Sequence, residues 1–284
     1  MTYFFQICHI RIRCDLPFAV VRAPEAEPFL TEAQTPDMQI EFHPVSTLTL
    51  PKGSFVQRGL CRFYTDSTGG TLCHLRGQPL QPVATVKWQW SQPDRLICNY
   101  LQQEIQWIST TKGILDAIGL ETVMLLRGAL LLHASLIRVQ GRGIVFTAPS
   151  GTGKSTQAGL WEQHRQAQIL NGDRAGLRKT DGRWYAYGLP YAGTSGVYRA
   201  EEAPLCAIIL LSQAKENQVT PATAAEALRF MYPELTVHRW DPEYVDRALA
   251  LFSQLCADIP IYRLECTPDE QAVQTLENTL FPTP

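Results

Sequence analysis

The middle of the chain carries a glycine-rich stretch that reads Ala148-Pro149-Ser150-Gly151-Thr152-Gly153-Lys154-Ser155-Thr156. In a glycine-rich turn at the start of a helix, the backbone amides point into one concavity, where the helix dipole also favours negative charge. Gly151 and Gly153 permit the backbone torsions, Lys154 can reach the β- and γ-phosphates, and the Ser155 hydroxyl can bind Mg²⁺. The stretch therefore predicts a nucleotide-phosphate site made by Ser150, Gly151, Thr152, Gly153, Lys154, Ser155 and Thr156.

The sequence on either side supports this prediction. An apolar run at 143–147 precedes the loop and a helical pattern at 156–166 follows it, which is the strand-loop-helix order that phosphate binding requires. The usual pattern has a glycine where this chain has Ala148, so the match departs at its first position. Because the flanking structure agrees, nucleotide binding is favoured over a chance match.

The second half of the chain alternates between predicted strands and helices. Apolar runs at 130–139 and 143–147 predict two adjacent core strands, and Asp181-Gly182 predicts the turn of a hairpin over 175–189. This alternation indicates an α/β domain. Further strands are expected at 168–170, 205–211 and 261–266, with helices at 222–232, at 243–256 and in a last segment that ends at Leu280.

The first 110 residues follow a different pattern, with period-two alternation typical of half-buried strands. Segments 58–66 and 71–76 flank Ser67-Thr68-Gly69-Gly70, and we expect a hairpin in which a glycine supplies the positive φ of the reversal. Helical spacing follows at 111–126. The predicted organisation is a β-rich N-terminal domain at 1–110 with a role in substrate recognition, a connecting helix at 111–128 and an α/β domain at 129–284.

Composition narrows the class of partner. A formal net charge of -2 over 284 residues gives no electrostatic reason to expect a nucleic acid or an anionic membrane. The sequence has no apolar run of about 18 residues and no basic start followed by an apolar stretch, so neither a membrane span nor a signal peptide is predicted. The eight cysteines form no CxxC pair, which favours free thiols and a cytoplasmic location.

A carboxylate follows the loop at a second predicted strand end. Asp173 comes directly after the strand-like segment 168–172, so it can hold Mg²⁺ or deprotonate a hydroxyl. The sequence has neither an LSGGQ signature of transporter ATPases nor an NKxD motif for guanine. Three weaker candidates follow. The glycine-containing segment 188–196 could cover a substrate, and Lys215 could neutralise phosphate. Residues 238–241 could face the acceptor.

Three motifs in order resemble the catalytic domain of HPr kinase/phosphorylase, and they read Leu132-His133-Ala134-Ser135, Pro149-Ser150-Gly151-Thr152-Gly153-Lys154-Ser155 and Asn171-Gly172-Asp173-Arg174. The resemblance implies a P-loop kinase domain of the HPr kinase C-terminal type, with ATP and Mg²⁺ as cofactors. It also implies that a histidine, here His133, lies near an aspartate, here Asp173, which acts as general base toward a serine hydroxyl. The family usually has two adjacent aspartates where this chain has Gly172-Asp173.

The rest of the chain departs from that family. The first 110 residues do not resemble its N-terminal domain, and its later substrate-recognition motif with glutamate and arginine is not found. The chain resembles more closely the dispersed branch that includes lasso-peptide tailoring kinases, in which the substrate varies.

The expected activity is transfer of the γ-phosphoryl group of ATP to a hydroxyl, first of all a Ser or Thr of a peptide or protein. The expected catalytic residues are Asp173, His133 and Lys154, and the expected metal ligands are Ser155 and Asp173. Two alternatives stay open, namely a kinase of small hydroxy compounds such as amino acids or sugars, and a non-catalytic ATP-binding module that recruits a peptide or partner. The oligomeric state also stays open, with a homo-oligomer among the alternatives.

Overall fold

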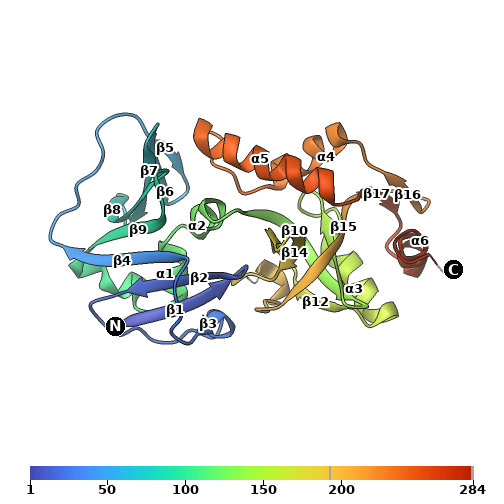
Figure 1. Cartoon of the computed structure of the whole chain (residues 1–284), viewed down its shortest axis with the longest axis horizontal. Coiled ribbons are helices and arrows are strands. Elements are labelled where there is room, and N and C mark those ends of the chain that lie inside the picture. The colour runs from blue at the N-terminus through green and yellow to red at the C-terminus, as the bar shows by residue number, and fades with distance from the viewer. Residues whose placement is uncertain (192, 283–284) are drawn as a thin grey trace. The chain divides into compact units, whose positions relative to one another are not determined.

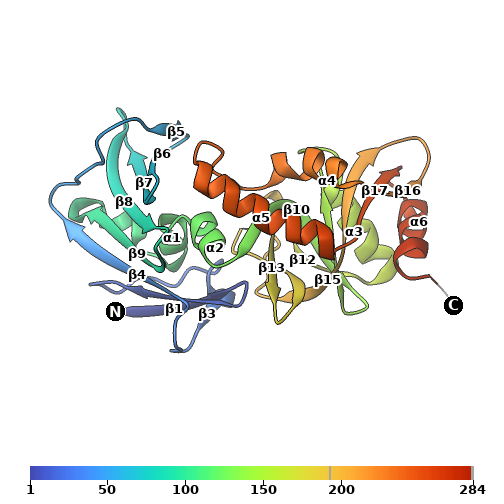
Figure 2. The same ribbon diagram turned by 45° about the horizontal axis from the view of Figure 1, so that its top comes forward.

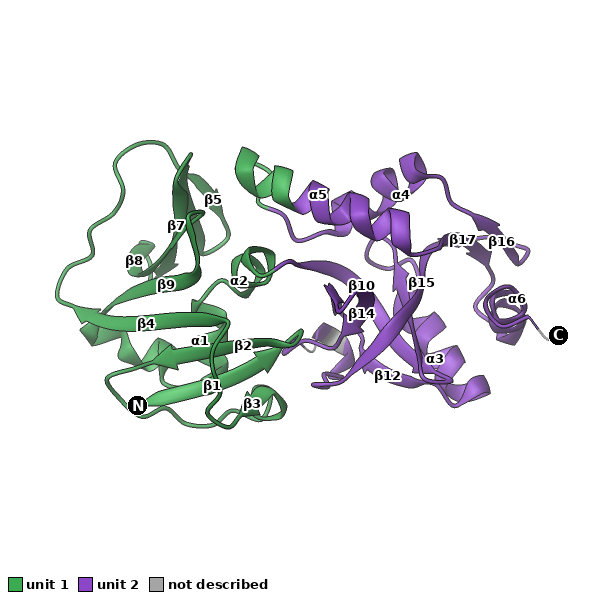
Figure 3. Ribbon diagram, in the orientation of Figure 1, with its two compact units in different colours: residues 1–127, 238–247 green, residues 128–237, 248–284 purple. Residues whose placement is uncertain are grey.

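The computed structural model describes residues 1–191 and 193–282, and the chain divides into two compact units (Figure 3). Unit 1 comprises Met1–Arg127 together with His238–Arg247, and unit 2 comprises Gly128–Val237 together with Ala248–Pro284. The segment His238–Arg247, which lies inside the expected domain at 129–284, therefore belongs to unit 1. Each unit is built around its own sheet.

Unit 1 contains one nine-stranded sheet (Figure 1), as its β-rich pattern predicts. Alternate residues Ile10, Ile12 and Cys14 are buried, which confirms the predicted half-buried strand. A short helical turn, η1 (Glu27–Phe29), precedes the edge strand β3. The strands run in the order β3 (Leu30–Thr31), β1 (Thr2–Ile7), β2 (Ile10–Asp15), β4 (Met38–Val45), β9 (Gln92–Leu101), β8 (Gln81–Gln89), β7 (Gly69–Arg76), β6 (Cys61–Asp66) and β5 (Val56–Arg58).

The predicted hairpin forms between β6 and β7. The prediction that a glycine supplies a positive φ at its reversal is wrong. The reversal falls at Ser67 and Thr68, and Oδ1 of Asp66 accepts a hydrogen bond from the Thr68 amide at 2.7 Å. A Cβ atom at Gly70 would collide with the ring of Trp88. Close approach of that ring, and not a positive φ, is what requires glycine here.

Residues 111–128, expected as one connecting helix, form two short helices within unit 1. They are α1 (Thr111–Ala117), whose first turn is capped by the Thr110 hydroxyl accepting from the Gly113 amide at 2.9 Å, and α2 (Leu120–Leu126). Gly119 separates them with a φ of 64°, a torsion that stops a right-handed helix. The preceding turn is η2 (Gln102–Ile108).

Unit 2 contains one eight-stranded sheet of mixed direction, so the predicted α/β class is confirmed at the level of a mixed α/β fold. The central strand β15 pairs in parallel with β11 on one side and β17 on the other. The strand order is β11 (Arg142–Thr147), β10 (Ala129–Val139), β13 (Arg174–Thr180), β14 (Arg183–Tyr187), β15 (Glu202–Gln213), β17 (Ile261–Cys266) and β16 (Gln218–Pro221), with β12 (Gln168–Asn171) paired to β10.

Two helices of unit 2 cover one face of these parallel strands (Figures 1 and 2). They are α3 (Lys154–Arg165) and α6 (Glu270–Leu280), and their buried residues Trp161 and Leu276 share one apolar core with Phe146 of β11. The other helical elements that involve this unit are α4 (Ala224–Met231), η3 (Gly193–Ser195), η4 (Tyr232–Glu234) and α5 (Pro242–Asp258), which starts in unit 1. In the described part of the chain, no helix is long and apolar enough to cross a membrane.

The hairpin predicted at Asp181-Gly182 is confirmed. Both residues have positive φ, 50° and 78°, as a two-residue turn between antiparallel strands requires. The turn joins β13 to β14, and β13 begins directly after Asp173.

Candidate functional site

The glycine-rich loop lies between the end of β11 at Thr147 and the start of α3 at Lys154. Gly151 and Gly153 have φ values of 79° and 113°, in the region that a side chain disfavours. Ala148, which departs from the usual pattern, is buried in the apolar core of unit 2. The loop therefore keeps its glycines where the backbone torsions need them, and its first residue packs against the core.

Lys154 is almost fully buried and folds back onto this loop. Its Nζ donates hydrogen bonds to the carbonyl oxygens of Ala148 at 2.7 Å and Pro149 at 3.3 Å. Burial lowers the pKa of this ammonium, and the nearby carboxylates Glu234 and Asp173 partly oppose that effect. The ammonium is thus held where it can exchange carbonyl oxygens for phosphate oxygens.

The loop borders a cavity of about 320 Å³. Because β11, β15 and β17 are parallel, their carboxyl ends meet at one edge of the sheet, where α/β proteins bind ligands. Gln213, at the end of β15, donates a hydrogen bond to the carbonyl oxygen of Thr152 at 3.3 Å. The cavity is lined by Gly151, Thr152, Gly153, Thr156, Gln157, Leu211, Gln213, Ala214, Cys266, Thr267 and Pro268.

Asp173 lies in the turn between β12 and β13, and the buried side chain of Asn171 shapes this turn. The Oδ1 atom of Asn171 accepts from the amides of Asp173 and Arg174, both at 2.9 Å, while its Nδ2 donates to the carbonyl oxygens of Leu189 and Tyr191 at 2.9 Å. The Asp173 carboxylate is 32% exposed and lies 3.5 Å from Nε of Arg174. Asn171 therefore ties the carboxylate turn to the segment that starts at Leu189.

The segment 188–196 packs closely on this turn in the residues that the structure describes, which exclude Ala192. A Cβ atom at Gly193 would lie 2.6 Å from Cβ of Asp173, and one at Gly172 would lie 2.6 Å from Cβ of Ser195. A second aspartate at position 172 would therefore collide with Ser195. This contact gives a physical reason for glycine at that position.

His133 lies on β10, and its ring pairs with a residue that the sequence analysis missed. Its Nδ1 atom is 2.6 Å from Oε2 of Glu234, whereas the resemblance implies Asp173 as its neighbour. Glu234 ends η4, and the chain after it runs along β10, with an isolated bridge between Leu132 and Leu235. No local sequence pattern marks Glu234, because it reaches the site through long-range pairing.

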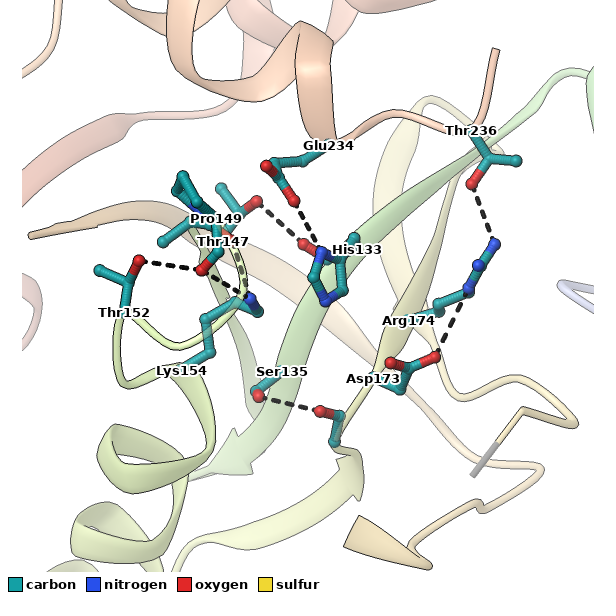
Figure 4. A network of polar contacts seen from close by, with 12 residues as sticks. His133, Ser135, Thr147, Pro149, Thr152, Lys154, Asp173, Arg174, Glu234 and Thr236 are labelled. Carbon is teal, nitrogen blue, oxygen red and sulfur yellow. Dashed lines mark hydrogen bonds and ion pairs between the residues drawn. The ribbon is translucent and has the colours of Figure 1, made fainter. Parts of the chain in front are cut away.

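The structure brings His133, Lys154, Asp173 and Glu234 into one region of unit 2 (Figure 4). The charge of Lys154 interacts with both carboxylates, and the backbone amide of Ala134 donates to the carbonyl oxygen of Asp173 at 3.0 Å. Figure 4 shows the His133 ring between Lys154 on one side and Asp173 with Arg174 on the other. Ser155 is exposed on the first turn of α3, directly after Lys154.

Two weaker candidates lie outside this group of side chains. Lys215 is exposed and lines a second cavity, which shares Thr267 with the cavity beside the loop. His238 is buried in unit 1, with its ring stacked on that of Tyr244 at 4.3 Å. The expectation that 238–241 faces an acceptor is wrong for His238, because its ring packs in an aromatic core.

The donor groups present fit a magnesium ion bound mainly through nucleotide. Mg²⁺ is usually held by one or two carboxylates together with phosphates and waters, and not by an all-protein cage. Ser155 and Asp173 offer one hydroxyl and one partly exposed carboxylate. In residues 1–191 and 193–282, no group of three or more His, Cys, Asp or Glu side chains is arranged to hold a metal ion.

Unit 1 has a larger cavity, of about 800 Å³. Its wall includes the rings of His74 and Trp107, whose centroids are 4.6 Å apart, and Nε2 of His74 hydrogen-bonds to the carbonyl oxygen of Ala117 at 2.9 Å. Arg76 and Asp116 also line it. The residues that line this cavity all belong to unit 1.

Contact between Gly193 and Asp173 leads to a testable prediction. Gly193→Ala is expected to displace the Asp173 carboxylate and, for the kinase activity that the resemblance implies, to lower the turnover rate about 100-fold, because a misplacement of about 1 Å can cost that much. Gly196→Ala is the matched control, since Gly196 also has positive φ, at 66°, but a Cβ there meets open space. Steady-state rates and thermal unfolding would be measured for both variants. Equal rates in the two variants would show that the contact with Asp173 has no importance for activity.

Comparison with known proteins identifies a family and a likeness to solved structures. A family model described as "ScmC: SynChlorMet cassette protein ScmC" matches residues 96–280, which include the loop, His133, Asp173 and Glu234. No curated protein matches the chain in sequence. Among solved structures, the HPr(Ser) kinase/phosphatase from Coxiella burnetii is similar over 52% of this chain and 91% of its own, with 11% identity and a TM-score of 0.31.

Proposed function

The chain belongs to the family of SynChlorMet cassette proteins ScmC, and for this member we propose an ATP-dependent phosphotransferase activity toward an alcohol group. The observation that carries the proposal is the convergence, within unit 2, of a phosphate-binding loop and two proton-accepting side chains. Lys154 belongs to the loop, and its charge interacts with Asp173. A phosphate held by the loop would therefore bind beside Lys154, in the region that also contains His133 and Asp173.

The nucleotide would bind through the loop and the cavity beside it. The backbone amides at 150–156 and the Lys154 ammonium hold the phosphates, because both supply positive charge at the start of α3. The cavity of about 320 Å³ next to Gly151 and Gly153 takes the nucleoside. Ser155 and Asp173 would hold Mg²⁺, which when bound neutralises charge on the β- and γ-phosphates.

In the proposed reaction, the oxygen of the acceptor hydroxyl forms a bond to the γ-phosphorus. The bond from that phosphorus to the β–γ bridging oxygen breaks, and ADP leaves with the electron pair. The hydroxyl proton passes to a side chain of this site, His133 or Asp173. Positioning and charge neutralisation supply most of the catalysis in such transfers.

We propose a Ser or Thr of a peptide or protein as the acceptor. His133 and Asp173 are each 32% exposed, so a chain segment can reach them. The cavity of about 800 Å³ in unit 1 supports a recognition role for that unit, because it can take an apolar side chain of such a substrate.

The experiment is incubation of the protein with ATP labelled in the γ-phosphate and three separate acceptor pools. These are Ser/Thr peptides, intact proteins, and small hydroxy amino acids and sugars. Label in the first or second pool is the expected result, and label in the third alone would move the proposal to a small-molecule kinase. If ATP binds but no pool is labelled and a peptide binds only with ATP present, the protein is a nucleotide-dependent recruiter and the proposal fails.

A further inference from the structure

Glu234 provides a second carboxylate in a site where position 172 is glycine. We infer that Glu234 is a positioning residue that fixes the ring of His133, and that His133, through its Nε2 atom, is the base that accepts the hydroxyl proton. The inference rests on the proposed phosphotransferase function and assigns Asp173 to the metal. The sequence alone gives Asp173 both the metal role and the base role. In this inference Asp173 keeps the metal role and His133 takes the base role.

The contact between the two residues is short and well supported. Oε2 of Glu234 lies 2.6 Å from Nδ1 of His133, and the glutamate side chain is only 12% exposed. The backbone on both sides of the contact is paired, since Thr236 donates its amide to the carbonyl oxygen of Leu131 at 2.9 Å and Leu235 forms a bridge with Leu132. Glu234 is therefore held opposite His133 by the fold.

This contact selects one form of the histidine. An ionised carboxylate can only accept hydrogen bonds, so Nδ1 must carry the proton that it donates to Glu234. In the neutral ring, Nε2 then has a free lone pair. A carboxylate that holds an imidazole in the tautomer needed for proton transfer is the arrangement found in Ser-His-Asp sites.

In this inference Asp173 serves as a metal ligand and not as the base. Its carboxylate lies beside Arg174, and the backbone at Gly193 packs against its side chain. Figure 4 shows Glu234 from η4, Lys154 from α3 and Arg174 around the His133 ring, and Arg174 is the register partner of His133 between β13 and β10. In His133, the hydrogen bond from Nδ1 to Glu234 leaves the lone pair on Nε2, so this atom can accept a proton.

In the step assigned to His133, the hydroxyl proton moves to Nε2 as the oxygen bonds to the γ-phosphorus. The ring becomes an imidazolium, and the negative charge of Glu234 stabilises it. ADP leaves with the electron pair of the broken bond, and the proton is later released to solvent. No oxidant or further co-reactant is needed.

The first test requires no catalysis. In ¹⁵N-labelled protein without nucleotide, the ring nitrogens of His133 are expected to show the Nδ1–H tautomer. Glu234→Ala is expected to shift the ring toward the Nε2–H tautomer that free histidine favours. A His133 ring that is Nε2–H in the wild-type protein, or that does not respond to Glu234→Ala, would overturn the inference.

The second test is a double-mutant cycle on the turnover rate. His133→Ala is expected to lower kcat about 10²–10³-fold and Glu234→Ala about 10²-fold, within the range for general base catalysis. The double variant should be no slower than His133→Ala, because Glu234 acts through the ring. Because the charge of Glu234 also interacts with Lys154, nucleotide affinity would be measured for each variant and kcat compared at saturating ATP.

Glu265→Ala is the control, since Glu265 is also a paired glutamate of unit 2, 2.9 Å from Arg263, and it should leave kcat at the wild-type value. Losses that multiply in the double variant, or an unchanged kcat in Glu234→Ala, would overturn the inference while leaving the phosphotransferase proposal standing. Absence of transfer by the wild-type protein would instead sink the proposed function.

Discussion

Asp173→Asn is expected to lower the rate of phosphoryl transfer about 10³-fold, within the range reported for loss of a catalytic charge or base. The substitution keeps the size of the side chain, so the contact with Gly193 and the turn held by Asn171 should persist. It removes the negative charge beside Lys154 and the proposed metal ligand. Transfer would be measured with labelled ATP, and ADP binding would be measured without divalent cations, where we expect no change.

Asp181→Asn is the matched control for this variant. Asp181 lies in the same unit, is exposed, and occupies a turn position with φ of 50° that asparagine tolerates well. Its rate should equal that of the wild-type protein. If Asp173→Asn were as active as Asp181→Asn over a range of Mg²⁺ concentrations, Asp173 would have neither the metal role nor the proton role.

Lys154→Ala is expected to weaken ATP binding about 10–100-fold, because a hydrogen bond to a charged group contributes about 1.5–3 kcal/mol. The ammonium donates to Ala148 and Pro149 within the loop, so it is already in place for the phosphates. Burial lowers its pKa, which shows that burial disfavours the charged form, so we expect little loss of stability from its removal. Calorimetric titration with ATP and thermal unfolding would measure the two effects.

Lys179→Ala makes the same change of charge on β13, where Lys179 pairs with Asp258 at 2.7 Å near the surface. Surface ion pairs contribute about 0–1 kcal/mol, so both stability and ATP binding should stay close to wild type. Equal ATP affinities in the two lysine variants would contradict a phosphate-binding role for the loop.

Local sequence was enough to predict the loop and its flanking elements. Glycine torsions, the apolar strand that ends at Thr147 and the helix that starts at Lys154 each depend on neighbouring residues. The turn at Asp181-Gly182 could also be predicted from local sequence, because both residues tolerate positive φ. The loop and its flanking elements place Lys154 at the start of α3.

Contacts between residues far apart in the sequence could not be predicted from the local pattern. Glu234 reaches His133 from across the fold of unit 2, and the glycine at position 70 is explained by the ring of Trp88 on another strand. His238 joins the core of unit 1 although most of the chain around it belongs to unit 2. In each case the deciding contact is tertiary, so neither propensity nor periodicity reveals it.

The most direct test of the proposed function follows the α-phosphate and the γ-phosphate of ATP in separate experiments. Wild-type protein and Lys154→Ala would be incubated with a Ser/Thr peptide library and ATP labelled in either the α- or the γ-phosphate. The account predicts that wild-type protein moves only the γ-label to a peptide hydroxyl, with one ADP formed for each phosphate transferred, and that Lys154→Ala moves far less. ADP formation without labelled peptide, or transfer of the α-label, would contradict it.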